Sequence, residues 1–89
     1  MSKLVFLNTT ILPAAFEDDE TYEDYPYKAS LVLSGVTSTM IPEVVFGLTE
    51  ILEGIFAPIS ETFNGGIYLY SNDIPDATII IPTIICWII

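Results

Sequence analysis

The sequence predicts a strand-rich α+β fold, in which one helix packs on a mainly antiparallel sheet. Apolar runs and apolar–polar alternation, the patterns of buried and half-buried strands, recur along the chain. Turn signals separate them, and Asn64-Gly65-Gly66 is the strongest because asparagine and glycine tolerate a positive φ. Helical spacing is confined to residues 42–53. The 89 residues are too few for a second core, so we expect a single domain, residues 1–89.

Two strands are predicted before the helix. Residues 3–12 contain the continuous apolar run Leu-Val-Phe-Leu, which is typical of a strand covered on both faces, and Pro13 ends it. Residues 27–36 alternate, with Ala29, Leu31 and Leu33 on one side and Ser30, Val32 and Ser34 on the other, which indicates a strand.

The single helix is predicted at residues 42–53. Pro42 is tolerated in a first turn, and Gly54 is a natural stop. Apolar side chains recur there at intervals of three and four residues and form one stripe: Val44, Leu48, Ile51, Leu52 and Ile55.

Three further segments are expected to be extended. Residues 55–63 read as a short strand interrupted by Pro58, and residues 67–71 alternate directly after the glycine turn. Residues 77–89 supply one or two last strands, with Pro82 permitting an edge or a bulge between them.

The C-terminal segment is apolar on both faces of a strand. Such a strand needs cover on both sides, so it is either a central strand of the molecule's own sheet or one that packs against another copy. Cys86 lies between Ile85 and Trp87, and we expect it to be a buried, inert thiol.

Residues 14–26 are predicted to be an acidic loop or mobile arm, because like charges at this density repel and do not pack. The segment holds six of the 12 acidic residues: Glu17, Asp18, Asp19, Glu20, Glu23 and Asp24. One interpretation is a solvated loop that keeps an apolar protein soluble. Another is a docking element for a basic protein surface, where the arm imitates the phosphates of nucleic acid. A calcium site is a third, although the EF-hand spacing with its central glycine is absent.

The charge of the chain excludes several functions. With 12 acidic residues, two lysines and neither arginine nor histidine, the formal net charge is −10. We expect no nucleic-acid binding, because affinity for phosphates comes from lysine and arginine. Without histidine there is no imidazole base or ligand, and no glycine-rich phosphate loop is present. The sequence therefore predicts no enzyme, no cofactor and no metal site.

The apolar content points to a partner. Hydrophobic residues make up 52% of the chain and charged residues 16%, with a mean hydropathy of +0.60. A domain this small leaves part of such surface exposed unless it self-associates or meets a membrane. A transmembrane span is not expected, because residues 74–89 fall short of roughly 20 residues and contain two prolines. The N-terminal run is too interrupted for a convincing signal peptide, which favours the cytoplasm or a virion.

Residues 4–12, Leu-Val-Phe-Leu-Asn-Thr-Thr-Ile-Leu, resemble the first strand of the viral ring nucleases, which degrade cyclic oligoadenylates and counter type III CRISPR defence. Residues 35–52 are similar to that family in pattern. The family carries a Gly-His motif, whereas this chain has Gly35-Val36 there and no histidine anywhere. The resemblance therefore transfers no activity to this chain.

The leading hypothesis is a non-enzymatic structural or assembly protein that forms a homo-oligomer, a filament or a virion component. Its self-association would use the apolar strands, through Ile67, Leu69, Ile79, Ile81, Ile85, Trp87 and Ile89. The alternative is a small acidic inhibitor of the kind that phages and viruses make. Its arm would dock on a basic, nucleic-acid-binding surface of a host protein through Glu17, Asp18, Asp19, Glu20, Tyr22, Glu23, Asp24 and Tyr25.

Overall fold

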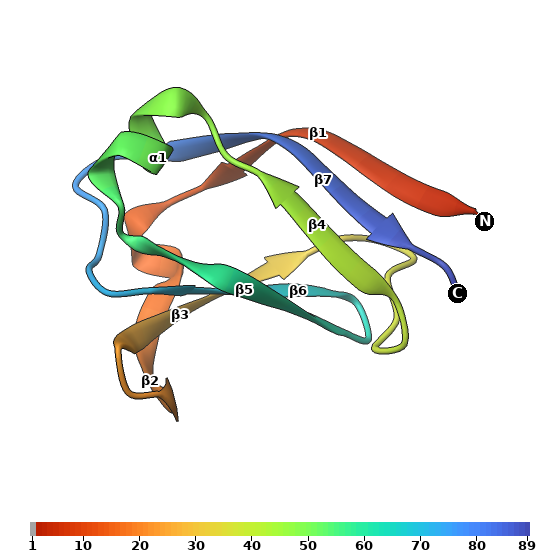
Figure 1. Ribbon diagram of the computed structural model, residues 1–89, viewed down its shortest axis with the longest axis horizontal. Helices are drawn as coiled ribbons and strands as arrows, with labels where there is room; N and C mark the ends of the chain where they lie inside the picture. The colour runs from red at the N-terminus through yellow and green to blue at the C-terminus, as the bar shows by residue number, and fades with distance from the viewer. Residues whose placement is uncertain (1) are drawn as a thin grey trace.

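The computed structural model describes residues 2–89. Two antiparallel sheets pack on each other and enclose the core between them (Figure 1). The strands are β1 (Lys3–Ile11), β2 (Phe16–Tyr22), β3 (Tyr25–Val32), β4 (Ile41–Val45), β5 (Phe56–Phe63), β6 (Gly66–Ser71) and β7 (Ile79–Trp87). A 3-10 turn, η1 (Pro13–Ala15), joins β1 to β2, and one short helix, α1 (Leu48–Glu53), joins β4 to β5.

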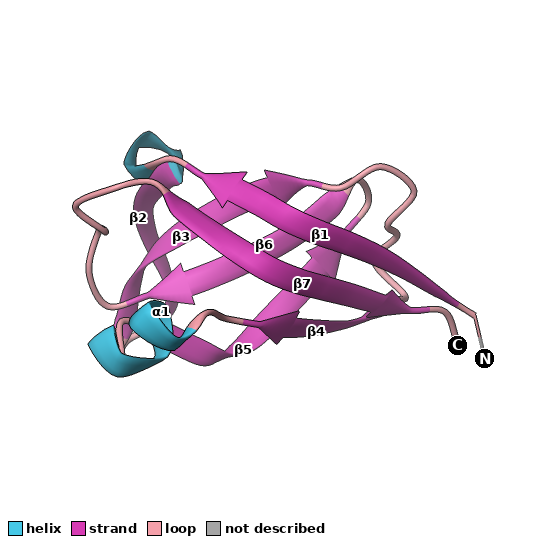
Figure 2. Cartoon of the chain, turned by 90° about the horizontal axis from the view of Figure 1, so that it is seen from above, coloured by secondary structure: helices cyan, strands magenta, loops and turns pink. Residues whose placement is uncertain are grey.

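The two sheets have different sizes. One has three strands in the order β1-β7-β4, and the other has four in the order β2-β3-β6-β5. Figure 2 shows β7 between β1 and β4, so the C-terminal strand is the centre of the smaller sheet. Both of its neighbours pair with it in antiparallel fashion.

The core lies between the inner faces of the sheets. β7 contributes Ile79, Ile81, Ile84 and Cys86, and β6 contributes Ile67 and Leu69. From the chain before them come Ile11, Phe16, Ala29, Leu31, Leu33 and Val36. The apolar side chains on one face of β7 therefore fill this core.

The strand-rich, antiparallel character predicted from the sequence is confirmed, but the helical part fits only roughly. Instead of one sheet with a helix packed on it there are two sheets. The helix expected at residues 42–53 is wrong over its first half, because Ile41–Val45 pair with β7 as β4. The helix that remains has six residues, all of them exposed or half-buried, and it ends at Gly54 in the left-handed conformation.

The acidic segment is extended rather than a loop. Residues 14–26 run from η1 through the whole of β2 into β3, and these two strands form a hairpin. β2 is an edge strand, so its acidic side chains can project into solvent while its backbone pairs on one side only. A loop was expected because clustered acidic side chains repel each other. At the edge of a sheet these side chains can point into solvent, so the segment can form a strand.

Candidate functional site

The outer face of the three-stranded sheet is lined by apolar side chains. The residues paired across it share this face row by row: Val5 with Ile85, Leu7 with Thr83 and Val45, Trp87 with Ile41. We define the apolar face as Val5, Leu7, Ile41, Val45, Ile80, Ile85 and Trp87. All three strands contribute to it, with the central strand β7 supplying the middle row.

Most of the apolar face is open to solvent. Its five exposed members are Val5 (47%), Leu7 (67%), Ile41 (52%), Val45 (47%) and Ile80 (54%). The other two, Ile85 and Trp87, lie in the central strand and are half-buried by their neighbours. An apolar patch that spans a whole sheet is unusual for a soluble monomer and is typical of an interaction site.

Two charged groups frame one end of the apolar face. Lys3 on β1 places its Nζ 5.0 Å from the centroid of the Trp87 ring. On the opposite strand, Glu43 accepts a 3.0 Å hydrogen bond through Oε1 from the Trp87 Nε1–H. The indole is thus held between a cation on one edge of the sheet and a carboxylate on the other, and these two charges balance.

The residues predicted for self-association divide into two groups. Four of them lie in the core, where a second copy cannot reach them: Ile67, Leu69, Ile79 and Ile81. The other three point outward or lie past the strand: Ile85 and Trp87 belong to the apolar face, and Ile89 is exposed beyond β7. Within β7 the division arises because the strand changes face between Ile81 and Ile84.

Five members of the apolar face were missed from the sequence. Ile80 shares its strand with the predicted set, and its alternation with Ile79 and Ile81 was the available signal. Val5 and Leu7 stood in a run interpreted as covered on both faces. Ile41 and Val45 could not be assigned to a sheet face, because Val45 lies within the predicted helix at residues 42–53 and Ile41 directly precedes it.

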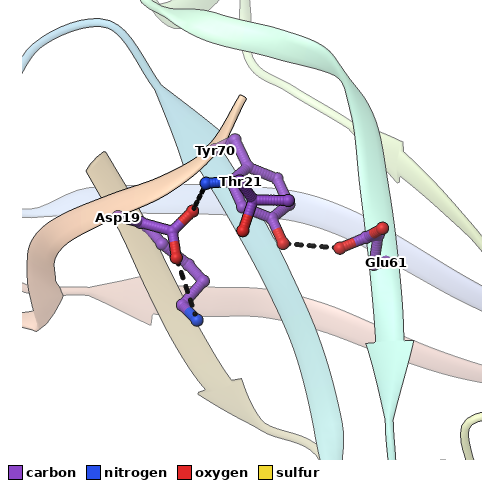
Figure 3. Close-up of polar contacts among 5 residues, drawn as sticks. Asp19, Thr21, Glu61 and Tyr70 are labelled. Carbon is purple, nitrogen blue, oxygen red and sulfur yellow. Dashed lines mark hydrogen bonds and ion pairs between the residues drawn. The ribbon is translucent and has the colours of Figure 1, made fainter. Parts of the chain in front are cut away.

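The acidic hairpin is fixed to the outer face of the other sheet. Lys28 on β3 forms an ion pair with Asp19 on β2, with Nζ and Oδ1 3.3 Å apart, and the Thr21 backbone N–H donates to Asp19 Oδ2 at 3.0 Å (Figure 3). Partial burial acts to raise the pKa of Asp19, but the hydrogen bonds from Thr21 and Lys28 outweigh it and lower the pKa. The carboxylate stays ionised and holds the edge strand in place.

A second anchor of the hairpin is Glu61 on β5. It accepts hydrogen bonds from two tyrosine hydroxyls, from Tyr70 at 2.5 Å and from Tyr22 at 3.0 Å (Figure 3 draws the first). The two rings meet edge to face with centroids 4.7 Å apart. Burial, followed by the bond to Glu61, raises the pKa of Tyr70, and the bond to Glu61 raises that of Tyr22.

The residues predicted for partner docking are also divided. Asp19 and Tyr22 are engaged within the molecule, and Tyr25 is half-buried. The acids that remain exposed on the hairpin are Glu17, Asp18, Glu20, Glu23 and Asp24. The hairpin therefore presents five free carboxylates on a fixed edge rather than on a mobile arm.

An open hollow of about 540 Å³ lies between β4, α1 and β5. Val44, Phe46, Ile51 and Phe56 give it apolar walls, and the Phe46 and Phe56 rings stack with centroids 4.6 Å apart.

Residues 2–89 bring together no group of three or more metal-ligating side chains. Helices in the same part of the chain lack the length and apolar character of a membrane span.

The chain was compared with models of protein families, with curated protein sequences and with solved structures, and none of them matches.

Proposed function

We propose that this chain is a non-enzymatic assembly protein that self-associates by covering its apolar face. The observation that supports the proposal is the exposure of Val5, Leu7, Ile41, Val45 and Ile80 on one side of a single sheet. Each buried square ångström of such surface contributes roughly 25 cal/mol, so covering the whole face is a substantial driving force. The proposal therefore rests on the surface of the sheet rather than on a pocket.

The test is the mass in solution, measured by light scattering behind size exclusion at low and high salt. The monomer has a mass of 9.8 kDa, and we expect a larger species whose population rises with protein concentration. Because the interaction is hydrophobic, high salt should preserve it. A monomer at every concentration would contradict the proposal.

A matched pair of variants locates the surface. Leu7→Lys places a charge on the apolar face at a position that is 67% exposed, so the fold tolerates it while association loses on the order of a hundredfold in affinity. Val32→Lys makes the same kind of change on β3, where Val32 is 87% exposed on the other sheet. We expect the first variant to be monomeric and the second to associate like the parent chain.

A second candidate function rests on the acidic hairpin. Five exposed carboxylates on an edge strand held by the Asp19–Lys28 ion pair suit a basic protein surface. This candidate retains the inhibitor hypothesis, but with a preformed docking edge in place of a mobile arm.

A lysine-rich peptide serves as the probe for this candidate. Neutralising Glu17, Asp18 and Glu20 together should weaken binding much more than neutralising Glu50, Glu53 and Asp73, which removes the same charge elsewhere. Equal losses in the two triple variants would mean that net charge alone attracts the peptide, and would count against the hairpin.

A further inference from the structure

We infer that the partner on the apolar face is a second copy of this chain, related by a twofold axis parallel to β7, so that β1 of each copy lies over β4 of the other. The inference rests on the proposed self-association and adds to it the partner, the orientation and the closure of the assembly.

Charge selects a second copy as the occupant. Two molecules that each carry a net charge of −10 repel unless the surfaces that meet are close to neutral. Among residues 2–89, the charged side chains on the outer side of the three-stranded sheet are Lys3 and Glu43, one of each sign. The acidic strand β2 belongs to the other sheet and lies far from this face (Figure 1). A basic protein would be drawn to β2 instead, and an anionic lipid surface would repel the molecule as a whole.

The positions of Lys3 and Glu43 select the orientation. Both lie near the same end of the sheet, Lys3 paired with Trp87 and Glu43 with the neighbouring Ile85, but on opposite edge strands. Rotation about an axis along β7 exchanges the two edges and keeps the ends together. It therefore brings Lys3 of each copy to within reach of Glu43 of the other, about two residues or roughly 7 Å along the strand.

The competing face-to-face arrangement loses this complementarity. Rotation about an axis that runs across the strands would place β1 over β1 and carry Lys3 to the opposite end of the partner's sheet. Lys3 would then meet the uncharged far end of the partner's β1, which includes Thr10, and Glu43 would lie over the partner's β4. Both charged groups would be partly desolvated without a partner of opposite sign. The first arrangement pairs all four charges.

The edges of the sheets disfavour growth into a filament. β4 and β5, two of the edge strands, carry Pro42 and Pro58, which cannot donate to an added strand. β2 carries the acidic side chains, and β1 is interrupted by Asn8 at φ 53°. These are the devices that prevent edge-to-edge pairing. A face that packs on its own copy is used up in the contact, so the assembly closes as a dimer.

The size of the sheet indicates a modest affinity. Three strands of up to nine residues present a surface of roughly 14 by 30 Å, which puts the contact toward the small end of specific interfaces. We therefore expect a dimer that dissociates on dilution, and one that is sensitive to a single pair of charges.

A charge exchange tests the orientation. Lys3→Glu places like charges opposite each other in the dimer, and Glu43→Lys does the same, so each single variant should raise the dissociation constant on the order of tenfold at low salt. The double variant restores opposite charges across the contact and should return to within about threefold of the parent chain. Thermal unfolding of all three variants checks that they remain folded.

The outcomes separate the inference from the proposed function. A parent chain that dimerises while the double exchange fails to restore its affinity would overturn the orientation and leave self-association intact. Masses that grow beyond two copies would overturn closure. A monomeric parent chain would remove the proposed function itself.

Discussion

Asn8 on β1 and Pro82 on β7 fall opposite each other in the register, between the pairs Leu7–Thr83 and Thr9–Ile81. At this point both strands change the face of the sheet to which their odd-numbered residues point. In β7, Ile81 faces the core before the change and Ile84 faces it afterwards, with two residues between them instead of one. Because both strands carry the extra residue at the same place, the register is preserved while the inward and outward faces exchange.

The first prediction concerns the backbone of Asn8. Within residues 2–89 it is the one residue other than glycine with a positive φ, 53°. Asparagine tolerates this region, whereas a β-branched residue is strained there. Asn8→Val should lower the free energy of unfolding by about 1–2 kcal/mol, measured by urea denaturation. Asn8→Gly is the control and should stay close to the parent chain, since equal losses in the two variants would assign the effect to the amide side chain instead.

This change of face limits how well alternation in the sequence predicts the inward residues of the C-terminal segment. A strand was predicted there, and one continuous strand is found. Its inward residues could not be chosen by counting in twos from one end, because Pro82 and Thr83 interrupt the count. The predicted set accordingly combined inward Ile79 and Ile81 with outward Ile85 and Trp87.

The helix error has a different physical cause. Val44, Leu48 and Ile51 have helical spacing, and the local pattern contains nothing that opposes it except the low helix propensity of the valines. The pairing of β4 with β7 joins residues some 40 positions apart, and it overrides this local preference. Such long-range pairing is not visible in a single sequence.

The order of the acidic hairpin likewise depends on contacts with residues that are distant in the sequence. Its composition correctly indicated an exposed segment, but its order comes from Lys28 and Glu61, which bind Asp19 and Tyr22. Lys28 is 9 residues away from Asp19 and Glu61 is 39 away from Tyr22. The exposed acids could therefore be predicted, while the contacts that fix them could not.

The second prediction concerns Gly66, at the start of β6. A Cβ at this position would lie 1.7 Å from the backbone oxygen of Leu31 on the neighbouring strand, so the two strands could not keep their pairing. Gly66→Ala should lower the free energy of unfolding by about 3 kcal/mol or more, and the thermal midpoint should fall accordingly. Gly47→Ala is the control, because its nearest atom would be 3.5 Å away, and it should cost less than about 1 kcal/mol. Similar midpoints for the two variants would contradict the close approach of β3 and β6.

The third prediction concerns the thiol of Cys86. It is fully buried, and burial raises its pKa, so both access and ionisation are suppressed in the folded chain. A disulfide reagent such as Ellman's should react slowly at neutral pH, with a rate that rises together with the unfolded fraction as urea is added. Rapid labelling in buffer alone would mean that β7 opens locally, and would contradict its place at the centre of the sheet.

The last prediction concerns stability at high pH. The Tyr70 side chain is buried and donates to Glu61, and its pKa is raised above its ordinary value of 10.0. Above about pH 10 the unfolded chain releases this proton while the folded chain retains it, so the unfolded state gains in stability relative to the folded one. The urea midpoint should therefore fall as the pH rises from 9 toward 11.

In Tyr70→Phe the midpoint should be lower at pH 7, because Glu61 loses a hydrogen bond, but its decline above pH 10 should be shallower. Tyr22→Phe removes the other, more exposed hydroxyl and should leave the decline nearly as steep as in the parent chain. If the three proteins declined in parallel, burial of the Tyr70 hydroxyl against Glu61 would not be the cause.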